Sequence, residues 1–293
     1  MLPGQRLESG VTALGTSVVM LGGFDSDVVH GLDITHEVDI LDPDAGTWSQ
    51  LPDAPIAWTH VNLMAAGGTL YLLGGLEGTN FVARGDAYAL DAGAASWRPL
   101  TPLPTGFERG AAALVASPPH LYIIGGAFTT GAVATGLDYD IATDTWSMLP
   151  VLPSARSHPA GMRMADGTLI VAGGLKTLDA SQPLAEVWAL PPGSTTWEAR
   201  APMPIAHGGC AYGTISGHLL CAGGEAGAAA LHIAMSYDPF LDQWTMLPDM
   251  PVERAGTQGA AVGQRLFVPG GAPLLQFEPS DTMSVYDALD TAP

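Results

Sequence analysis

The sequence predicts an all-β fold made of six copies of one four-stranded unit, a six-bladed propeller. The main observation is a glycine pair that ends an apolar run six times along the 293 residues. The pairs recur every 47 to 52 residues, a period typical of propeller blades. They are Gly22-Gly23, Gly74-Gly75, Gly125-Gly126, Gly173-Gly174, Gly223-Gly224 and Gly270-Gly271.

A tryptophan accompanies five of the glycine pairs. It follows the pair by 20 to 25 residues, and a proline stands seven positions after it each time. We expect this large side chain to fill the space between neighbouring blades. The five are Trp48, Trp97, Trp146, Trp197 and Trp244.

Each unit contains four short apolar or alternating runs separated by turn residues. In the second unit the predicted strands are 61–66, 69–73, 86–91 and 96–100, because such runs of Val, Leu, Tyr and Trp favour strands. The tight turn at Gly67-Gly68 predicts a hairpin between the first two. The glycine pair is expected to end the second strand, where backbones crowd. Each unit is therefore predicted to be a four-stranded antiparallel meander.

These motifs resemble the Kelch repeat. The resemblance is carried by LYLLGG, DAYALD and SWRPLTPLP in the second unit, and by YDIATDTWSMLPVLPSAR and YDPFLDQWTMLPDMPVER further on. It covers essentially the whole chain and implies a Kelch-type β-propeller. It implies little about activity, because one fold carries many functions.

The repeat register predicts how the ring closes. We expect one domain over residues 1–293, with Pro293 at the position where a sixth tryptophan would stand. Both termini should then lie close together at the sixth blade. Its outer strand is expected to be short, split or missing.

Composition and charge exclude some partners. The net charge is −19 and Lys176 is the only lysine, so the chain is not expected to bind nucleic acid. No run of 18 apolar residues exists, so no membrane span is expected. The chain starts without an apolar signal segment, and we expect a monomer located in the cytoplasm.

The two cysteines, Cys210 and Cys221, fall on the first two predicted strands of the fifth blade. A turn at Ser216-Gly217 brings them near each other, so a cross-strand disulfide is one alternative. Buried free thiols are the favoured expectation, because the strands are apolar and the geometry of such a bridge is restrictive.

One repeat position concentrates the arginines of the chain. Counting 16 residues back from each glycine pair, or 17 in the fourth unit, leads to one residue per blade. In a meander ring this position is expected at the mouth of the central channel, and His60 and His158 follow it by two residues. We call these residues the ring positions: Arg6, Trp58, Arg109, Arg156, His207 and Arg254.

The ring positions predict a ligand-binding face. Arginine offers a planar charged fork suited to carboxylates, and Trp58 offers an apolar platform. The structural alternative is that each arginine pairs with a loop carboxylate or carbonyl and holds the blades in register. Glu108 and Glu253 are candidate internal partners of this kind.

The loops after the glycine pairs complete this face. Residues 24–37 mix aspartates, histidines and a glutamate but match no metal motif, so we expect a solvated polar loop and no metal site. The later loops 81–84, 127–137 and 274–277 are more apolar. Exposed apolar loops around a channel mouth favour a binding surface.

No catalytic motif of the common kinds is present: no GxSxG elbow, phosphate loop or dinucleotide fingerprint. The leading hypothesis is a noncatalytic module, without a cofactor, that binds an acidic peptide or carboxylated ligand at the arginine face. The alternatives are a carbohydrate isomerase or mutarotase, suggested by other Kelch propellers, and a purely structural scaffold. The enzyme would draw its general acid or base from His60, His158, His207 and Glu108.

Overall fold

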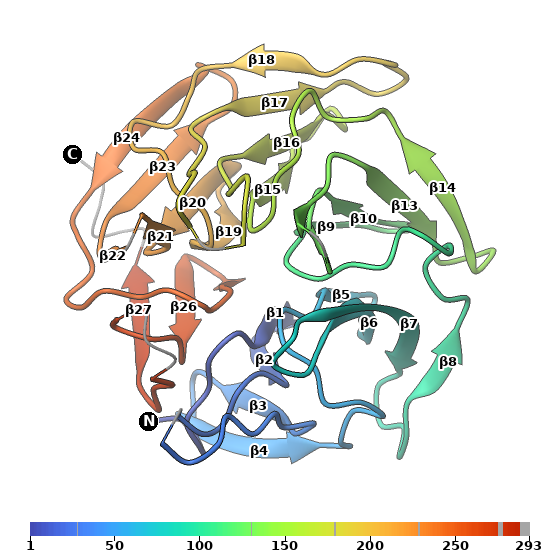
Figure 1. Ribbon diagram of the computed structural model, residues 1–293, viewed down its shortest axis with the longest axis vertical. Coiled ribbons are helices and arrows are strands. Elements are labelled where there is room, and N and C mark those ends of the chain that lie inside the picture. The colour runs from blue at the N-terminus through green and yellow to red at the C-terminus, as the bar shows by residue number, and fades with distance from the viewer. Residues whose placement is uncertain (28, 130, 179, 228, 275–277, 288–293) are drawn as a thin grey trace.

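The computed structural model describes residues 1–27, 29–129, 131–178, 180–227, 229–274 and 278–287. Six antiparallel sheets stand radially around a central axis, as Figure 1 shows, and these are the six predicted blades. Consecutive strands pair in each blade, so each sheet is a meander. Within the described residues there is no helix long and apolar enough to cross a membrane.

The strands of the first three blades run from the axis outward in chain order. Blade 1 consists of β1 (Gly10–Leu14), β2 (Ser17–Leu21), β3 (Val38–Asp42) and β4 (Thr47–Leu51). Blade 2 consists of β5 (Leu63–Ala66), β6 (Thr69–Glu77), β7 (Val82–Leu90) and β8 (Arg98–Leu100). Blade 3 consists of β9 (Ala113–Ser117), β10 (His120–Ile124), β13 (Gly136–Asp140) and β14 (Thr145–Leu149), with the small hairpin β11 (Ala127–Phe128) and β12 (Gly131–Ala132).

The other three blades follow the same plan. Blade 4 consists of β15 (Ala160–Arg163), β16 (Leu169–Ala172), β17 (Val187–Leu190) and β18 (Glu198–Arg200). Blade 5 consists of β19 (Ala211–Ile215), β20 (His218–Ala222), β23 (Ala234–Asp238) and β24 (Gln243–Leu247), with the hairpin β21 (Glu225–Ala226) and β22 (Ala229–Ala230). Blade 6 has three strands in the part of the chain that is described, β25 (Ala260–Val262), β26 (Arg265–Pro269) and β27 (Met283–Asp287).

The glycine pair ends the second strand as predicted, except in blade 2. There β6 continues through the pair to Glu77, and its register with β7 shifts between Leu73 and Gly75. The strand continues because only a short turn, 78–81, separates β6 from β7. The glycines are used here to form a bulge inside a longer hairpin.

The recurrent tryptophans link neighbouring blades, as expected. The indole N–H of Trp97 in blade 2 donates to Pro52 O at 2.9 Å, and its ring packs in a cluster with core residues of blade 1. Trp197 makes the equivalent bond to Pro150 O at 2.8 Å. Trp97 and Trp197 therefore each add a polar contact to the apolar surface that they bury between two blades.

The N-terminal segment lies against the sixth blade. Leu2 N donates to Asp281 O at 2.7 Å, and Arg6 N donates to Ser280 O at 3.0 Å. Leu152 N makes the corresponding bond to Ala134 O in blade 3, so Leu2 occupies a regular repeat position. The predicted meeting of the N-terminus with the sixth blade is confirmed, whereas residues 288–293 lie outside the described residues.

Candidate binding site at the mouth of the central channel

The glycine pair of one blade and the ring position of the next form a single joint. Gly126 N donates to Arg156 O at 2.8 Å, and a Cβ on Gly125 would lie 2.7 Å from the same oxygen. Both glycines also have positive φ. The same backbone bond recurs between Gly23 and Trp58, Gly174 and His207, Gly224 and Arg254, and Gly271 and Arg6. The constant spacing in the sequence therefore reflects a structural contact between blades.

Three ring arginines direct their guanidinium groups at backbone carbonyls of their own blade. Arg109 Nη1 donates to Gly125 O at 3.0 Å and to Thr135 O at 2.7 Å. Arg156 Nη1 donates to Gly173 O at 2.9 Å, and Arg254 Nη1 donates to Gly270 O at 2.9 Å. All three side chains are buried, and burial lowers the pKa of Arg109 to about 10.

The other ring positions are equally enclosed. Arg6 pairs with Glu37 and with Asp39, which is 3.1 Å away. Trp58 is 2% exposed and belongs to the core cluster of blades 1 and 2, so it offers no open platform. His207 is 1% exposed, and its Nδ1 lies 2.8 Å from Ile205 O. This arrangement matches the structural alternative, in which the ring holds the blades in register.

The residues that reach the axis stand two positions after the ring positions. All six have left-handed backbone conformations, with φ between 51° and 65°. We call them the axial belt: Glu8, His60, Ala111, His158, Gly209 and Gly256. A positive φ is uncommon for residues other than glycine, and such strain clusters at functional sites.

A chain of backbone hydrogen bonds joins the axial belt across the blades. Glu8 N donates to Gly256 O, His60 N to Glu8 O, and Ala111 N to His60 O. His158 N then donates to Ala111 O, and Gly209 N to His158 O, with N···O distances between 2.6 and 2.9 Å for the five bonds. The belt thus forms a hydrogen-bonded backbone collar around the axis. Three of its members, Glu8, His60 and His158, carry titratable side chains.

The two belt histidines and Glu8 come together above the collar. His60 Nε2 lies 3.1 Å from Glu8 Oε2, and the centroids of the rings of His60 and His158 are 5.2 Å apart. Burial lowers the pKa of His60 to about 3 and that of His158 to about 4, whereas burial raises the pKa of Glu8. Both imidazoles are therefore neutral at pH 7.

This cluster forms one side of a cavity of about 200 Å³, which we call the mouth pocket. Most of its remaining lining is apolar and comes from the loops above the blades. That lining includes Leu7, Leu76, Phe81, Leu178 and Leu274. The predicted apolar loops 81–84 and 274–277 contribute Phe81 and Leu274 to the pocket, while residues 275–277 lie outside the described residues.

Two side chains cross the channel below the mouth pocket. Leu114 N donates to the hydroxyl of Tyr212 at 2.8 Å, which connects blade 3 with blade 5. Gln258 of blade 6 accepts from Val11 N and donates to Val61 O, both at 3.1 Å. A second cavity of about 400 Å³, lined by the innermost strands, also includes Tyr212 and Gln258 in its lining.

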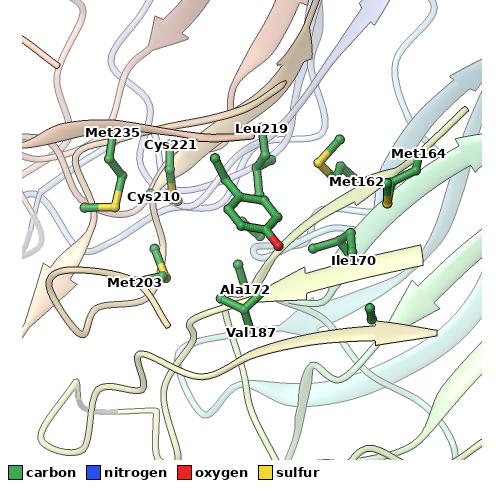
Figure 2. Packing of buried hydrophobic residues seen from close by; sticks show 13 residues of the cluster. Met162, Met164, Ile170, Ala172, Val187, Met203, Cys210, Leu219, Cys221 and Met235 are labelled. Atoms are coloured by element: carbon green, nitrogen blue, oxygen red, sulfur yellow. A yellow bond between two sulfur atoms is a disulfide. The ribbon is translucent and has the colours of Figure 1, made fainter. Parts of the chain in front are cut away.

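Cys210 and Cys221 form a disulfide, so the expectation of free thiols is wrong. The pair lies in the core cluster shared by blades 4 and 5, which Figure 2 shows from close by. In the register of β19 and β20, Tyr212 is opposite Cys221, which places Cys210 diagonally across with a Cα–Cα distance of 5.5 Å. That separation suits a disulfide.

His60 and His158, both predicted at the channel mouth, line the mouth pocket, whereas Glu8 was not among the predicted site residues. The signal was available, because Glu8 follows Arg6 by the same two residues that separate His60 from Trp58. Glu108, a candidate acid or base, instead accepts a hydrogen bond from Gly106 N at 2.9 Å. Glu253, a candidate partner of an arginine, lies 3.4 Å from His232 Nδ1.

Comparison with protein families adds the decisive observation. A model described as the KLHDC2/KLHL20/DRC7 Kelch-repeats domain matches residues 60–271, and a model of the Kelch motif matches residues 5–55. The chain belongs to the Kelch-repeat family. Membership supports a Kelch-type interaction or scaffold module at this coarse level.

Individual Kelch relatives resemble the chain over different lengths. Kelch-like protein terF of Aspergillus terreus is 30% identical over 284 residues, which cover 91% of this chain and 61% of that protein. Kelch domain-containing protein 8B of Homo sapiens is 32% identical over 143 residues, or 45% of this chain and 40% of that protein. Kelch-like protein 33 of Homo sapiens is 29% identical over 132 residues, 45% of this chain and 25% of that protein. The chain spans less than two thirds of each relative.

Proposed function

We propose that this Kelch propeller is a binding module that takes up an apolar side chain of a partner protein in the mouth pocket. The observation that carries the proposal is the apolar lining of a cavity of about 200 Å³ at the loop face. An apolar cavity of about 150 Å³ accommodates a benzene ring, so this pocket has room for one bulky side chain. Such a buried anchor commonly dominates the energy of an interface.

We expect basic residues on either side of the apolar anchor residue in the partner segment. The chain has a net charge of −19, and its field attracts cationic segments. The acidic loop that holds Asp25 and Asp33 begins at Phe24, which shares a cluster with Leu7 of the pocket wall. Charge complementarity would chiefly increase the association rate and select among partners.

The acidic peptide or carboxylated ligand expected from the sequence stays a prediction. The ring arginines were expected to bind the carboxylates of this ligand. Their guanidinium groups are instead buried and bonded to carbonyls or carboxylates of their own chain. A carboxylate in the mouth pocket would instead meet Glu8 and two neutral imidazoles. A basic, apolar-anchored segment therefore fits the pocket better than an acidic one.

The carbohydrate isomerase or mutarotase alternative also stays a prediction. The observation in its favour is that His60 and His158 line the mouth pocket as neutral bases. The arginines that would hold an acidic sugar do not line it in the same way, since Arg109 and Arg156 are buried against carbonyls. A noncatalytic binding module needs neither a general base nor arginines that hold an acidic sugar.

Selection from a random-peptide library, followed by binding measurements on the enriched peptides, tests the proposal. We expect enriched peptides to carry one bulky apolar residue flanked by Lys or Arg. Leu274→Ser, which removes an exposed apolar wall of the pocket, should weaken their binding about tenfold, equivalent to about 1.4 kcal/mol.

Leu241→Ser is the matched control, because Leu241 is also exposed but lies in the outer turn between β23 and β24. This variant should bind the peptides as the parent does. Enrichment of acidic peptides, or equal binding by the parent and Leu274→Ser, would overturn the proposal.

A further inference from the structure

We infer that Glu8, His60 and His158 form a binding site for a single divalent transition-metal ion. Each residue offers one ligand atom, and these atoms all lie within 4.8 Å of one another. The three residues come from blades 1, 2 and 4 and converge on the axis at the base of the mouth pocket. Two imidazole nitrogens and one carboxylate oxygen are a donor set that suits zinc, cobalt or ferrous iron.

A hydroxyl group holds the nitrogen of His60 that is turned away from Glu8. Thr59 Oγ1 lies 2.9 Å from His60 Nδ1 and 3.4 Å from Leu76 O. The other ring nitrogen, Nε2, faces Glu8 and is the atom that would bind an ion. Metal-ligating histidines are commonly oriented by such a second hydrogen bond.

His158 repeats the arrangement two blades further on. Ser157 Oγ donates to Thr177 O at 3.5 Å and lies 3.1 Å from His158 Nδ1. A hydroxyl residue directly before each histidine therefore orients both rings in the same way. A cation bound between the two imidazoles and Glu8 would be coordinated by all three side chains.

The backbone holds the ligands in place before any ion binds. All three belong to the axial belt and have φ between 51° and 58°, whereas the other belt positions carry Ala111, Gly209 and Gly256. The backbone bonds of the belt keep the three Cα atoms in fixed positions. Small residues at the other positions keep the axis free of further side chains from the belt.

The site leaves room for exchange of ligands. Three protein ligands leave at least one coordination position of a tetrahedral ion open, and this position would face the mouth pocket. The other cluster of ligand types in the described residues, His207 with Cys210 and Cys221, has both sulfurs in a disulfide. The metal site uses the polar base of the mouth pocket, whereas the proposed peptide binding uses its apolar wall.

Titration of the metal-stripped protein with Co²⁺, followed by visible absorption, and with Zn²⁺, followed by calorimetry, tests the inference. Reductant is left out so that the disulfide stays intact, and no peptide is present. We expect one ion per chain and cobalt bands typical of nitrogen and oxygen ligands. Glu8→Gln and His158→Gln should each weaken binding at least about tenfold, and Thr59→Val, which removes the orienting hydroxyl of His60, by about 10- to 100-fold.

His218→Gln is the control, because His218 lies on β20 and faces Asp238 at 3.4 Å, away from the axis. It should bind metal as the parent does. If the parent protein fails to bind one equivalent of Co²⁺ or Zn²⁺, the inference is wrong. Equal loss of binding in His218→Gln and His158→Gln would overturn it as well.

Discussion

At the scale of single residues, buried ring arginines donate to backbone carbonyls of their own blade. Counting from the glycine pairs placed Arg109 and Arg254 at equivalent points, and the structure has them there. The orientation depends on carbonyls such as Gly125 O that become available only when the blade has folded. A guanidinium group that finds two aligned carbonyls in its own blade satisfies its donors there, since buried donors need partners.

Arg109→Ala should therefore destabilise the fold more than it changes any binding. It leaves the carbonyls of Gly125 and Thr135 without these donors and removes a buried side chain, which we expect to cost about 3 kcal/mol. Urea unfolding followed by tryptophan fluorescence measures the loss. Arg98→Ala, which breaks an exposed pair with Asp91, should change stability by about 0.5 kcal/mol or less. Similar values for the two variants would contradict the structural role of Arg109.

At the scale of elements, the repeat pattern predicted strands well where periodicity alone decides them. The second unit has its strands close to the predicted ranges, and the extension of β6 to Glu77 was missed because a bulge depends on the length of the following turn. The disulfide was missed for a related reason. Spacing in the sequence places Cys210 near Cys221 but does not give the register that puts them diagonally opposite.

The disulfide should contribute measurably to the stability of blade 5. The double variant Cys210→Ala/Cys221→Ala opens a loop with a sequence separation of 11 residues, for which loop entropy predicts a loss of about 2–3 kcal/mol. Urea unfolding with and without reductant provides the check. Reductant should destabilise the parent by a similar amount and leave the double variant unchanged. A parent insensitive to complete reduction would refute this contribution.

At the scale of the whole molecule, blade number and the position of closure followed from the sequence, whereas the interior of the channel did not. Glycine pairs count blades directly, and Arg6 in register with Arg254 indicated where the first and sixth blades meet. The hydrogen bond from Leu114 N to the hydroxyl of Tyr212 joins strands of blades 3 and 5. A repeat pattern cannot predict such a contact across the axis, because it occurs only once. The candidate site likewise rests on side chains that differ from blade to blade, such as Glu8 and His158, which explains why the fold was easier to predict than the site.

Tyr212→Phe should lower the stability of the molecule by about 1 kcal/mol, because Leu114 N loses its acceptor while the ring stays in place. Hydrogen exchange should show faster exchange at the Leu114 amide in blade 3, although the substitution is in blade 5. Tyr88→Phe on β7, away from the innermost strands, is the comparison and should leave Leu114 unaffected. Unchanged exchange at Leu114 in Tyr212→Phe would contradict this prediction.

The side chains that cross the channel change how the repeats cooperate in unfolding. Stacked repeats usually behave as a one-dimensional array, in which each unit is stabilised by its two neighbours alone. Tyr212 links blade 5 to blade 3, and Gln258 links blade 6 to blade 2, so each pair skips a neighbour. Fraying of one blade therefore costs contacts in a blade that it does not touch along the ring, and the six units should unfold more nearly as one cooperative body than their repetition suggests.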